Sequence, residues 1–288
     1  MEDVLSSNNL ENESLRALFQ KDLKAIRGLY SEEILNLVEN NIDILLKDYI
    51  AWQKAIMATA RSLGVEDNNV SEIPNMIEQA TFERVKKILS EVRTEKIVLG
   101  IAGPGAVGKE TIKDALGFDA VVNTTTRPKR DYEKEAQHYN FIDDTQFKSI
   151  VAQDGFIVSM ERPGRGQYGI QKKDIEKVLG KYKISIVEEN PANLTKLSEY
   201  IQKREGCEFI IVYILPPYPV LPHLAARLAG RCQKTGSDFR SAIASTLGIR
   251  QLNEFVSVLD SMEKGNNVIF VVNDSVDRAV GKIKDLVK

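Results

Sequence analysis

The first third of the chain carries apolar residues at helical spacing. Along one predicted helix they recur three, four or seven residues apart, which places them on one face: Val38, Ile42, Leu45, Tyr49, Trp52, Ile56 and Leu63. A second helical pattern covers residues 73–92. We therefore predict an all-α domain of three or four helices over residues 15–93. The polar residues 1–14 are expected to form a disordered tail.

From residue 94 onward the pattern changes to short β-branched runs separated by amphipathic stretches. The runs show little polar alternation, which is typical of parallel strands buried on both faces; they cover residues 96–102, 119–123, 184–188, 209–215 and 267–272. The amphipathic stretches cover residues 109–116, 145–153, 191–203, 219–231 and 274–287. This alternation predicts an α/β domain over residues 94–288, with helices on both sides of a parallel five-stranded sheet.

A glycine-rich loop follows the first predicted strand and precedes a helix. It has the G-x-x-x-x-G-K spacing of a P-loop, in which glycines turn successive N–H groups toward one phosphate site and the helix N-terminus adds positive charge. The lysine supplies a cation for the β- and γ-phosphates. We expect these residues to bind the phosphates of ATP: Gly103, Gly105, Ala106, Val107, Gly108, Lys109, Glu110 and Thr111. The alternative is a glycine-rich turn with a chance lysine.

Glu110 stands where P-loops usually carry the hydroxyl that meets Mg²⁺, and Thr111 comes one position later. The carboxylate either repels phosphate or points to solvent from the first helical turn, where glutamate is favourable. We expect no direct protein metal site. Mg²⁺ would arrive with ATP, and Thr111 is the candidate hydroxyl for it.

Two arginines follow the second predicted strand. Arg127 and Arg130 lie three residues apart, and forked guanidinium groups bind phosphate bidentately. Glu133 can orient one of them, and Tyr139 adds a hydroxyl donor. The pattern predicts a site for an anionic acceptor, the alternative being a solvated basic turn.

This segment resembles the guanylate kinase family, whose signature is T-T-R-x-x-R, a glutamate three residues on, and Y-x-F. The same residues stand here from Thr125 to Phe141. Tyr168-Gly169 is similar to the family's Y-G motif. The blocks from Pro216 to Arg231 and from Val272 to Asp274 resemble its lid and last strand. The resemblance covers about residues 96–288 and leaves the N-terminal helical extension unmatched.

The resemblance implies a three-layer P-loop NTPase fold with a lid, and phosphoryl transfer from ATP with Mg²⁺ to a nucleoside monophosphate, with GMP or dGMP as default acceptor. The residues implied to hold the acceptor phosphate are Arg127, Arg130, Glu133, Tyr139 and Tyr168. Those implied to be catalytic are Lys109, Arg127, Arg227, Arg231 and Arg240.

The positions that read the base depart from the family. The family's hydroxyls and its guanine-binding glutamate are replaced by Asn123, by Val158 or Ser159, and by Ile170. Glu188 stands where the family has an aspartate beside the acceptor. Losing the glutamate leaves guanine donors unpaired, which weakens guanine selectivity. Glu161 would substitute if its loop shifted inward. The second reading of the chain is a guanylate-kinase-like module that binds a nucleotide or a phosphorylated partner without turnover.

Composition excludes some function classes. A formal charge of −2 gives no reason to expect binding to nucleic acid or anionic lipid. Two cysteines and two histidines disfavour a zinc site. The chain begins without a signal-peptide pattern and has no apolar run that spans a bilayer, so we expect a soluble cytoplasmic protein. For the N-terminal helices, a bundle core and a dimerising coiled coil are both open. The expected role is partner binding, self-association or regulation of the kinase.

Overall fold

The core of the fold is a parallel five-stranded sheet. The structure, a computed structural model, describes residues 2–65, 70–131, 133–162, 164 and 166–288. All strand pairs in this sheet are parallel, in the order β2-β7-β1-β8-β9. The bounds are β1 Lys96–Ala102, β2 Asp119–Ala120, β7 Ile184–Glu188, β8 Cys207–Leu215 and β9 Asn267–Val272. The five predicted runs are confirmed as its strands, although the run over 119–123 forms only two strand residues.

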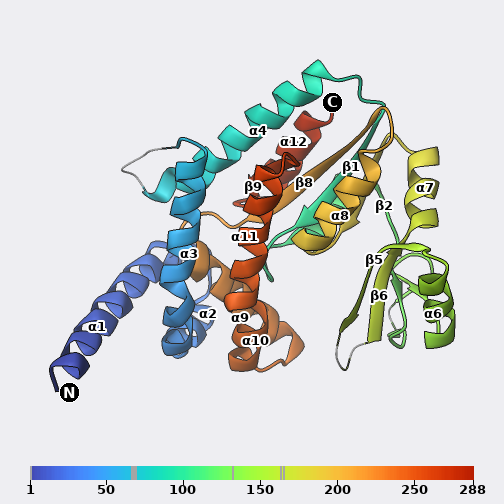
Figure 1. Cartoon of the computed structure of the whole chain (residues 1–288). Coiled ribbons are helices and arrows are strands. Elements are labelled where there is room, and N and C mark those ends of the chain that lie inside the picture. The colour runs from blue at the N-terminus through green and yellow to red at the C-terminus, as the bar shows by residue number, and fades with distance from the viewer. Residues whose placement is uncertain (1, 66–69, 132, 163, 165) are drawn as a thin grey trace.

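Helices cover both faces of this sheet and complete three layers (Figure 1). α5 packs with α12 on β1 and β9, whereas α8 packs with α11 on β8 and β9. The helices of this domain are α5 Lys109–Leu116, α6 Asp144–Ala152, α7 Lys172–Lys181, α8 Pro191–Ile201, α9 Val220–Thr235, α10 Phe239–Thr246, α11 Ile249–Glu263 and α12 Val276–Leu286. The predicted α/β class is confirmed; α7, α10 and α11 are additions to the predicted set.

A second, four-stranded sheet lies beyond the β2 edge (Figure 1). Its order is β4-β3-β6-β5, with bounds β3 Thr124–Thr125, β4 Asn140–Phe141, β5 Phe156–Arg162 and β6 Gly166–Gln171. α6 packs on it through Phe147, which stacks on Phe156 at 4.5 Å between ring centres. Sequence patterns did not predict this sheet. β3 and β4 have two residues each and show no periodicity. A register shift between Phe156 and Val158 interrupts the alternation of β5, and β6 carries two glycines, which are depleted in strands.

Four α-helices form the N-terminal region: α1 Glu2–Ala25, α2 Glu32–Glu39, α3 Ile42–Ser62 and α4 Ile73–Glu91. Short 3₁₀-helices cover Arg27–Leu29 and Val70–Glu72. The stripe predicted as one helix is therefore divided at Asn40 and Asn41. The Asn41 side chain donates to the Leu37 carbonyl at 2.9 Å, as asparagine does where it competes with helical hydrogen bonds.

Helix α1 begins at Glu2, within residues 1–14, the segment for which the sequence predicts a disordered tail. The helix starts at Glu2 and is anchored by Phe19 and Leu23, which are buried. Once a helix is nucleated at such an anchor, each further residue adds one backbone hydrogen bond at low cost. The polar composition of the first residues therefore does not prevent a helix.

The N-terminal helices share one hydrophobic core with the α/β domain. The buried cluster is continuous from Phe19 to Leu286 and includes the whole apolar stripe of α2 and α3. Trp52, the largest fully buried side chain, packs on Phe255 of α11 with ring centres 5.8 Å apart. The stripe is thus buried by contacts within the chain, as the bundle alternative expects.

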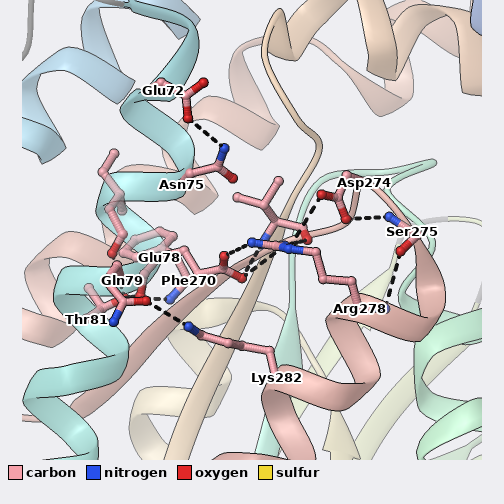
Figure 2. A network of polar contacts seen from close by, with 12 residues as sticks. Glu72, Asn75, Glu78, Gln79, Thr81, Phe270, Asp274, Ser275, Arg278 and Lys282 are labelled. Carbon is pink, nitrogen blue, oxygen red and sulfur yellow. Dashed lines mark hydrogen bonds and ion pairs between the residues drawn. The ribbon is translucent and has the colours of Figure 1, made fainter.

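Helix α4 covers the open edge of β9 (Figure 2). Phe270 and Val272 point their N–H groups away from β8, and these donate to Thr81 Oγ1 and Glu78 Oε1, both at 3.1 Å. Arg278 of α12 forms an ion pair with the same Glu78 carboxylate, which is 2% exposed. α4 therefore satisfies donors that an edge strand leaves unpaired.

Within the part of the chain that the structure describes, no helix is both long and apolar enough to cross a membrane.

Candidate active site

The glycine-rich loop lies between β1 and α5 at the carboxyl end of the parallel sheet. Three of its residues have left-handed backbone: Gly103 with φ 145°, Ala106 with φ 64° and Gly108 with φ 97°. Ala106 carries a Cβ in this region, which costs about 1 kcal/mol. Gly105, predicted to serve the same turn, is not among the residues with positive φ. The bent loop leads directly into the N-terminus of α5. The loop N–H groups and the helix N-terminus together favour the binding of an anion.

Lys109 is held over the loop by two backbone carbonyls. Its Nζ donates to Gly103 O at 2.8 Å and to Pro104 O at 3.1 Å. Burial lowers the pKa of Lys109, while the charges of Glu188 and Glu254 act to raise it. These carbonyls are neutral acceptors, so phosphate oxygens are stronger partners for the same ammonium group.

The arginines predicted for the lid occupy three different environments. Arg227 donates to Val107 O at 3.1 Å and to Asn273 O at 2.7 Å, so its guanidinium supports the backbone of the loop. Arg231 is exposed on α9, and its charge acts to lower the pKa of Lys109. Arg240 is exposed in the first turn of α10, and no described hydrogen bond or ion pair joins it to the loop.

Glu110 and Thr111 are both exposed in the first turn of α5. Of the two alternatives for Glu110, repulsion of phosphate or exposure to solvent from the first helical turn, the structure has the second. Among the described residues, no group of three or more His, Cys, Asp or Glu side chains is placed to hold a metal ion.

Arg127 and Glu133 form a bidentate ion pair at the predicted acceptor side. Arg127 Nη1 donates to Glu133 Oε2 at 2.7 Å, and Nη2 donates to Oε1. The Arg130 backbone N–H donates to the same carboxylate at 2.9 Å. These hydrogen bonds, that from Arg127 first, lower the pKa of Glu133 to about 2. Glu133 therefore orients Arg127, while the Arg130 side chain is exposed.

Tyr139 lies at the centre of the acceptor side. The Arg127 guanidinium is 4.9 Å from its ring centre, and the Tyr168 ring is 6.1 Å from it. Arg162, which sequence reasoning missed, lies 4.6 Å from the centre of the Tyr168 ring. Burial raises the pKa of Tyr139, the charges of Arg127 and Arg162 act to lower it, and Glu188 acts to raise it. Tyr139 thus contacts Arg127 and Tyr168, and the charges of Arg162 and Glu188 act on its phenol from farther away.

Strand pairing decides which β5 side chains share the face of Tyr168. Val158 lies opposite Ile170, and Arg162 lies opposite Gly166, in antiparallel register. Because side chains alternate along a strand, Val158 and Arg162 lie on the Tyr168 face. Ser159 lies on the other face and is exposed, as is Glu161. The alternation of 158, 160 and 162 is the signal that would have found Arg162, once the hairpin register was known.

The predicted base region is therefore mainly apolar. Val158 is 4% exposed and Ile170 is 1% exposed. The Asn123 Oδ1 atom is buried and finds no hydrogen-bond partner among the described residues. A buried amide oxygen without a donor is rare, so Asn123 is the polar group in this region best placed to accept from a ligand.

Two carboxylates at the end of β7 connect the donor and acceptor sides. Glu188, paired with Ile101 of β1, forms an ion pair with Lys113 at 3.3 Å. Its charge acts on both Lys109 and Tyr139. Glu189 was not predicted; it accepts from Asn193 at 2.7 Å and lies 4.0 Å from Arg162. Burial raises the pKa of Glu189, which the Asn193 hydrogen bond opposes.

Comparison with known proteins adds sequence relatives to this geometry. The family model described as guanylate kinase matches residues 93–288. The guanylate kinase of Clostridium acetobutylicum is 30% identical over 195 residues, covering 66% of this chain and 84% of its own length. That of Clostridium perfringens is 31% identical over 193 residues, covering 65% and 81%. The crystal structure of guanylate kinase from Anaplasma phagocytophilum is 18% identical, covers 68% and 86%, and superposes with a TM-score of 0.46.

Proposed function

This chain belongs to the guanylate kinase family, and we propose that it transfers the γ-phosphoryl group of ATP to a nucleoside monophosphate. One observation carries the proposal. At the carboxyl end of β7, which pairs with β1, Glu188 lies 3.3 Å from Lys113 of α5, the helix that follows the glycine-rich loop. The next residue, Glu189, lies 4.0 Å from Arg162, which packs on Tyr168. Ligands of open α/β sheets bind at this edge, so a donor and an acceptor would meet there.

The residues suit in-line transfer without covalent catalysis. The loop N–H groups would bind the β- and γ-phosphates, and the Lys109 ammonium would exchange its carbonyl partners for phosphate oxygens. Arg127, oriented by Glu133, would hold the acceptor phosphate together with Arg130, Tyr139 and Tyr168. An acceptor phosphate oxygen then attacks the γ-phosphorus, and the bond to the β-phosphate oxygen breaks. Arg231 adds positive charge on the donor side.

Mg²⁺ would arrive with ATP. The described residues offer it no carboxylate cluster, and Thr111 presents an exposed hydroxyl beside the loop, which fits a metal held mainly by phosphate oxygens. When bound, the ion neutralises the charge that develops on the transferring group.

GMP or dGMP is the default acceptor, with weak selectivity for the base. Val158 and Ile170 offer guanine no hydrogen bond, and each unpaired donor costs ~1–3 kcal/mol. The Asn123 oxygen would accept one such bond. We therefore expect the kcat/KM values for adenine, cytosine and uracil nucleotides to lie closer to the value for guanine nucleotides than they would in a site that hydrogen-bonds the base.

A second function, binding of a phosphorylated ligand without turnover, is favoured by the same apolar base region beside intact arginines. The placement of Lys109 over a bent P-loop favours the kinase, because binding alone has no use for a cation at the γ-phosphate. Self-association or partner binding through the N-terminal helices, and cytoplasmic location, stay predictions.

The test is an ADP-formation assay with ATP, Mg²⁺ and each nucleoside monophosphate in turn. We expect at least one acceptor to support turnover, and Lys109→Ala to lower kcat by about 10²–10³-fold, the scale on which removing one preorganised charge partner acts. If no acceptor produces ADP above the Lys109→Ala background, the kinase proposal fails. Retained binding of a monophosphate in that case would favour the second function.

A further inference from the structure

The turn between α10 and α11 packs directly on the glycine-rich loop. We call residues 246–251 the α10–α11 corner. The Gly105 N–H donates to the side-chain oxygen of Gln251 at 3.0 Å. A Cβ built on Gly105 would lie 2.0 Å from Cγ2 of Thr246. Since Gly105 has no positive φ, this close approach is the reason that the position requires glycine.

Gln251 is oriented toward the loop by its own helix. Its Nε2 donates to Glu254 Oε2 at 3.2 Å, so the amide oxygen is the atom left to accept from Gly105. Glu254 also brings a negative charge that acts to raise the pKa of Lys109. The corner thus contributes an acceptor and a charge to the donor side of the site.

The other side of the corner is held by the N-terminal extension. Trp52 of α3 donates its indole N–H to Leu247 O at 3.4 Å. Leu247 is the C-cap of α10 and is fully buried. Carbonyl groups at the end of a helix lack intrahelical partners, so the Leu247 carbonyl needs a donor from outside α10. Trp52 also packs on Phe255, which lies on Tyr213 of β8 with ring centres 5.5 Å apart.

These contacts form one chain from α3 through the corner to the loop. We propose that Trp52 is a positioning residue, which holds the α10–α11 corner as a lid on the glycine-rich loop, so that the N-terminal helices set the geometry of the donor site. No residue outside the extension replaces the Trp52 donor at Leu247 among the described hydrogen bonds. The part of the proposal that concerns ATP rests on the proposed function.

The first test measures amide hydrogen exchange of the ligand-free full chain over residues 239–255. Trp52→Phe keeps an aromatic ring and removes the N–H donor. We expect about tenfold faster exchange in the corner, because a buried carbonyl loses its partner. The control is Tyr30→Phe, which removes another hydrogen bond between the extension and the α/β domain, that of Tyr30 to His223 at 3.0 Å, and leaves the corner unchanged. Equal exchange in both variants overturns the proposal.

A second variant approaches the corner from the loop. Trp52 is the single tryptophan of the chain, so the tryptophan fluorescence of the chain comes from this residue alone. Gln251→Ala should increase quenching of Trp52 by acrylamide, since the corner loses its attachment to Gly105. Unchanged quenching would show that the loop and the extension do not share the corner. This result is available even where Trp52→Phe does not fold.

Titration with ATP and Mg²⁺ separates this proposal from the proposed function. We expect ATP to change Trp52 fluorescence in the wild-type chain, and Trp52→Phe, followed by calorimetry, to bind ATP about tenfold more weakly while Tyr30→Phe binds normally. If the wild-type chain does not bind ATP but exchange is still faster in Trp52→Phe, the kinase proposal fails and the proposal for Trp52 stands. If Trp52→Phe binds ATP normally and its exchange is unchanged, the proposal for Trp52 fails and the kinase proposal stands.

Discussion

At the scale of single residues, the acceptor side depends on arginines placed against aromatic rings. Arg127 lies against Tyr139, and Arg162 lies against Tyr168. The aromatic faces attract the cations, while Glu133 forms a bidentate ion pair with Arg127 and Glu189 lies 4.0 Å from Arg162. This arrangement gathers positive charge at one place, and an anionic acceptor, as proposed above, would find its partners already oriented.

We predict that Arg162→Ala raises the KM for the acceptor about tenfold, the effect of losing ~1.4 kcal/mol of charge attraction. Steady-state kinetics at saturating ATP measures this, and the KM for ATP should change little. Arg204→Ala is the matched control, because Arg204 also lies against a tyrosine, Tyr200 at 4.2 Å, on the helix-α8 side of the sheet. Similar KM values for wild type and Arg162→Ala would contradict a role in acceptor binding.

His223 makes the stability of the fold depend on pH. His223 is buried in α9, and its Nδ1 atom shares a hydrogen bond with the hydroxyl of Tyr30 in the extension. Burial, followed by the charge of Arg227, lowers the pKa of His223 to about 4. As pH falls below about 6.5, His223 becomes protonated in the unfolded chain, whereas in the folded chain it stays neutral until about pH 4. The contribution of His223 is therefore complete above pH 6.5 and is lost between pH 6.5 and 4.

We predict that the free energy of unfolding decreases by roughly 3 kcal/mol from this residue between pH 6.5 and 4. Urea unfolding at a series of pH values measures it. His223→Gln should flatten the curve across this window, since glutamine does not titrate. A His223→Gln chain with the same slope as the wild type would assign the pH dependence to other groups.

At the scale of elements, α4 acts as the missing neighbour of an edge strand. Thr81 and Glu78 lie one turn apart on α4 and accept from alternate residues of β9. Figure 2 shows both side chains directed at the strand, with Lys282 of α12 reaching Gln79 beside them. Three residues along the helix span about 4.5 Å and two residues along the strand span about 6.6 Å, so the side chains of Thr81 and Glu78 bridge the remaining difference to reach the two donors.

We predict that Thr81→Val lowers the free energy of unfolding by ~1–3 kcal/mol, because valine keeps the shape of threonine and leaves the buried Phe270 N–H unpaired. Urea unfolding measures the change. Ser90→Ala is the control on the same helix. Ser90 is exposed, and its described hydrogen bond goes to the Lys87 carbonyl. Removing its hydroxyl should change the free energy of unfolding by at most about 0.5 kcal/mol, the usual scale of surface changes. Equal effects of the two substitutions would count against the edge-strand account.

At the scale of the whole molecule, the N-terminal helices share one buried core with the α/β domain. The buried cluster crosses from the extension into the α/β domain without a break. Hydrogen bonds of Thr81, Glu78, Trp52 and Tyr30 join residues about 190 positions apart. Removing the extension would expose the β9 edge and the apolar surface under α3 together.

We predict that a chain starting at Thr94 is insoluble or unfolds without a cooperative transition, because an open, apolar strand edge pairs with other chains. Expression and thermal melting test this. Co-expression of residues 1–93 as a separate fragment should restore solubility, which distinguishes a missing packing partner from a general expression defect. A soluble truncated chain with a cooperative melt would mean that the two parts fold independently.

The sequence by itself determined the features that depend on local spacing. Five buried β-branched runs predicted the strands of the parallel sheet, and the glycine-lysine spacing predicted the bent loop before α5. The spacing of Arg127, Arg130 and Glu133 predicted an oriented guanidinium, because a short loop keeps such residues within reach of one another. It did not predict the small sheet, because β3 and β4 are too short to show a period, β5 has a register shift and β6 carries two glycines. It also did not predict the division of the apolar stripe at Asn40 and Asn41.

Only the tertiary structure decided which distant residues meet. Hairpin register selected Val158 over Ser159 and brought Arg162 to Tyr168. The approach of Thr246, and not the backbone angle, explained Gly105, while Ala106 took a left-handed position that the glycine pattern did not mark. Trp52 meets Leu247 because helices of one chain fill one core. Periodicity states which face of a helix is buried, but packing alone determines what covers it.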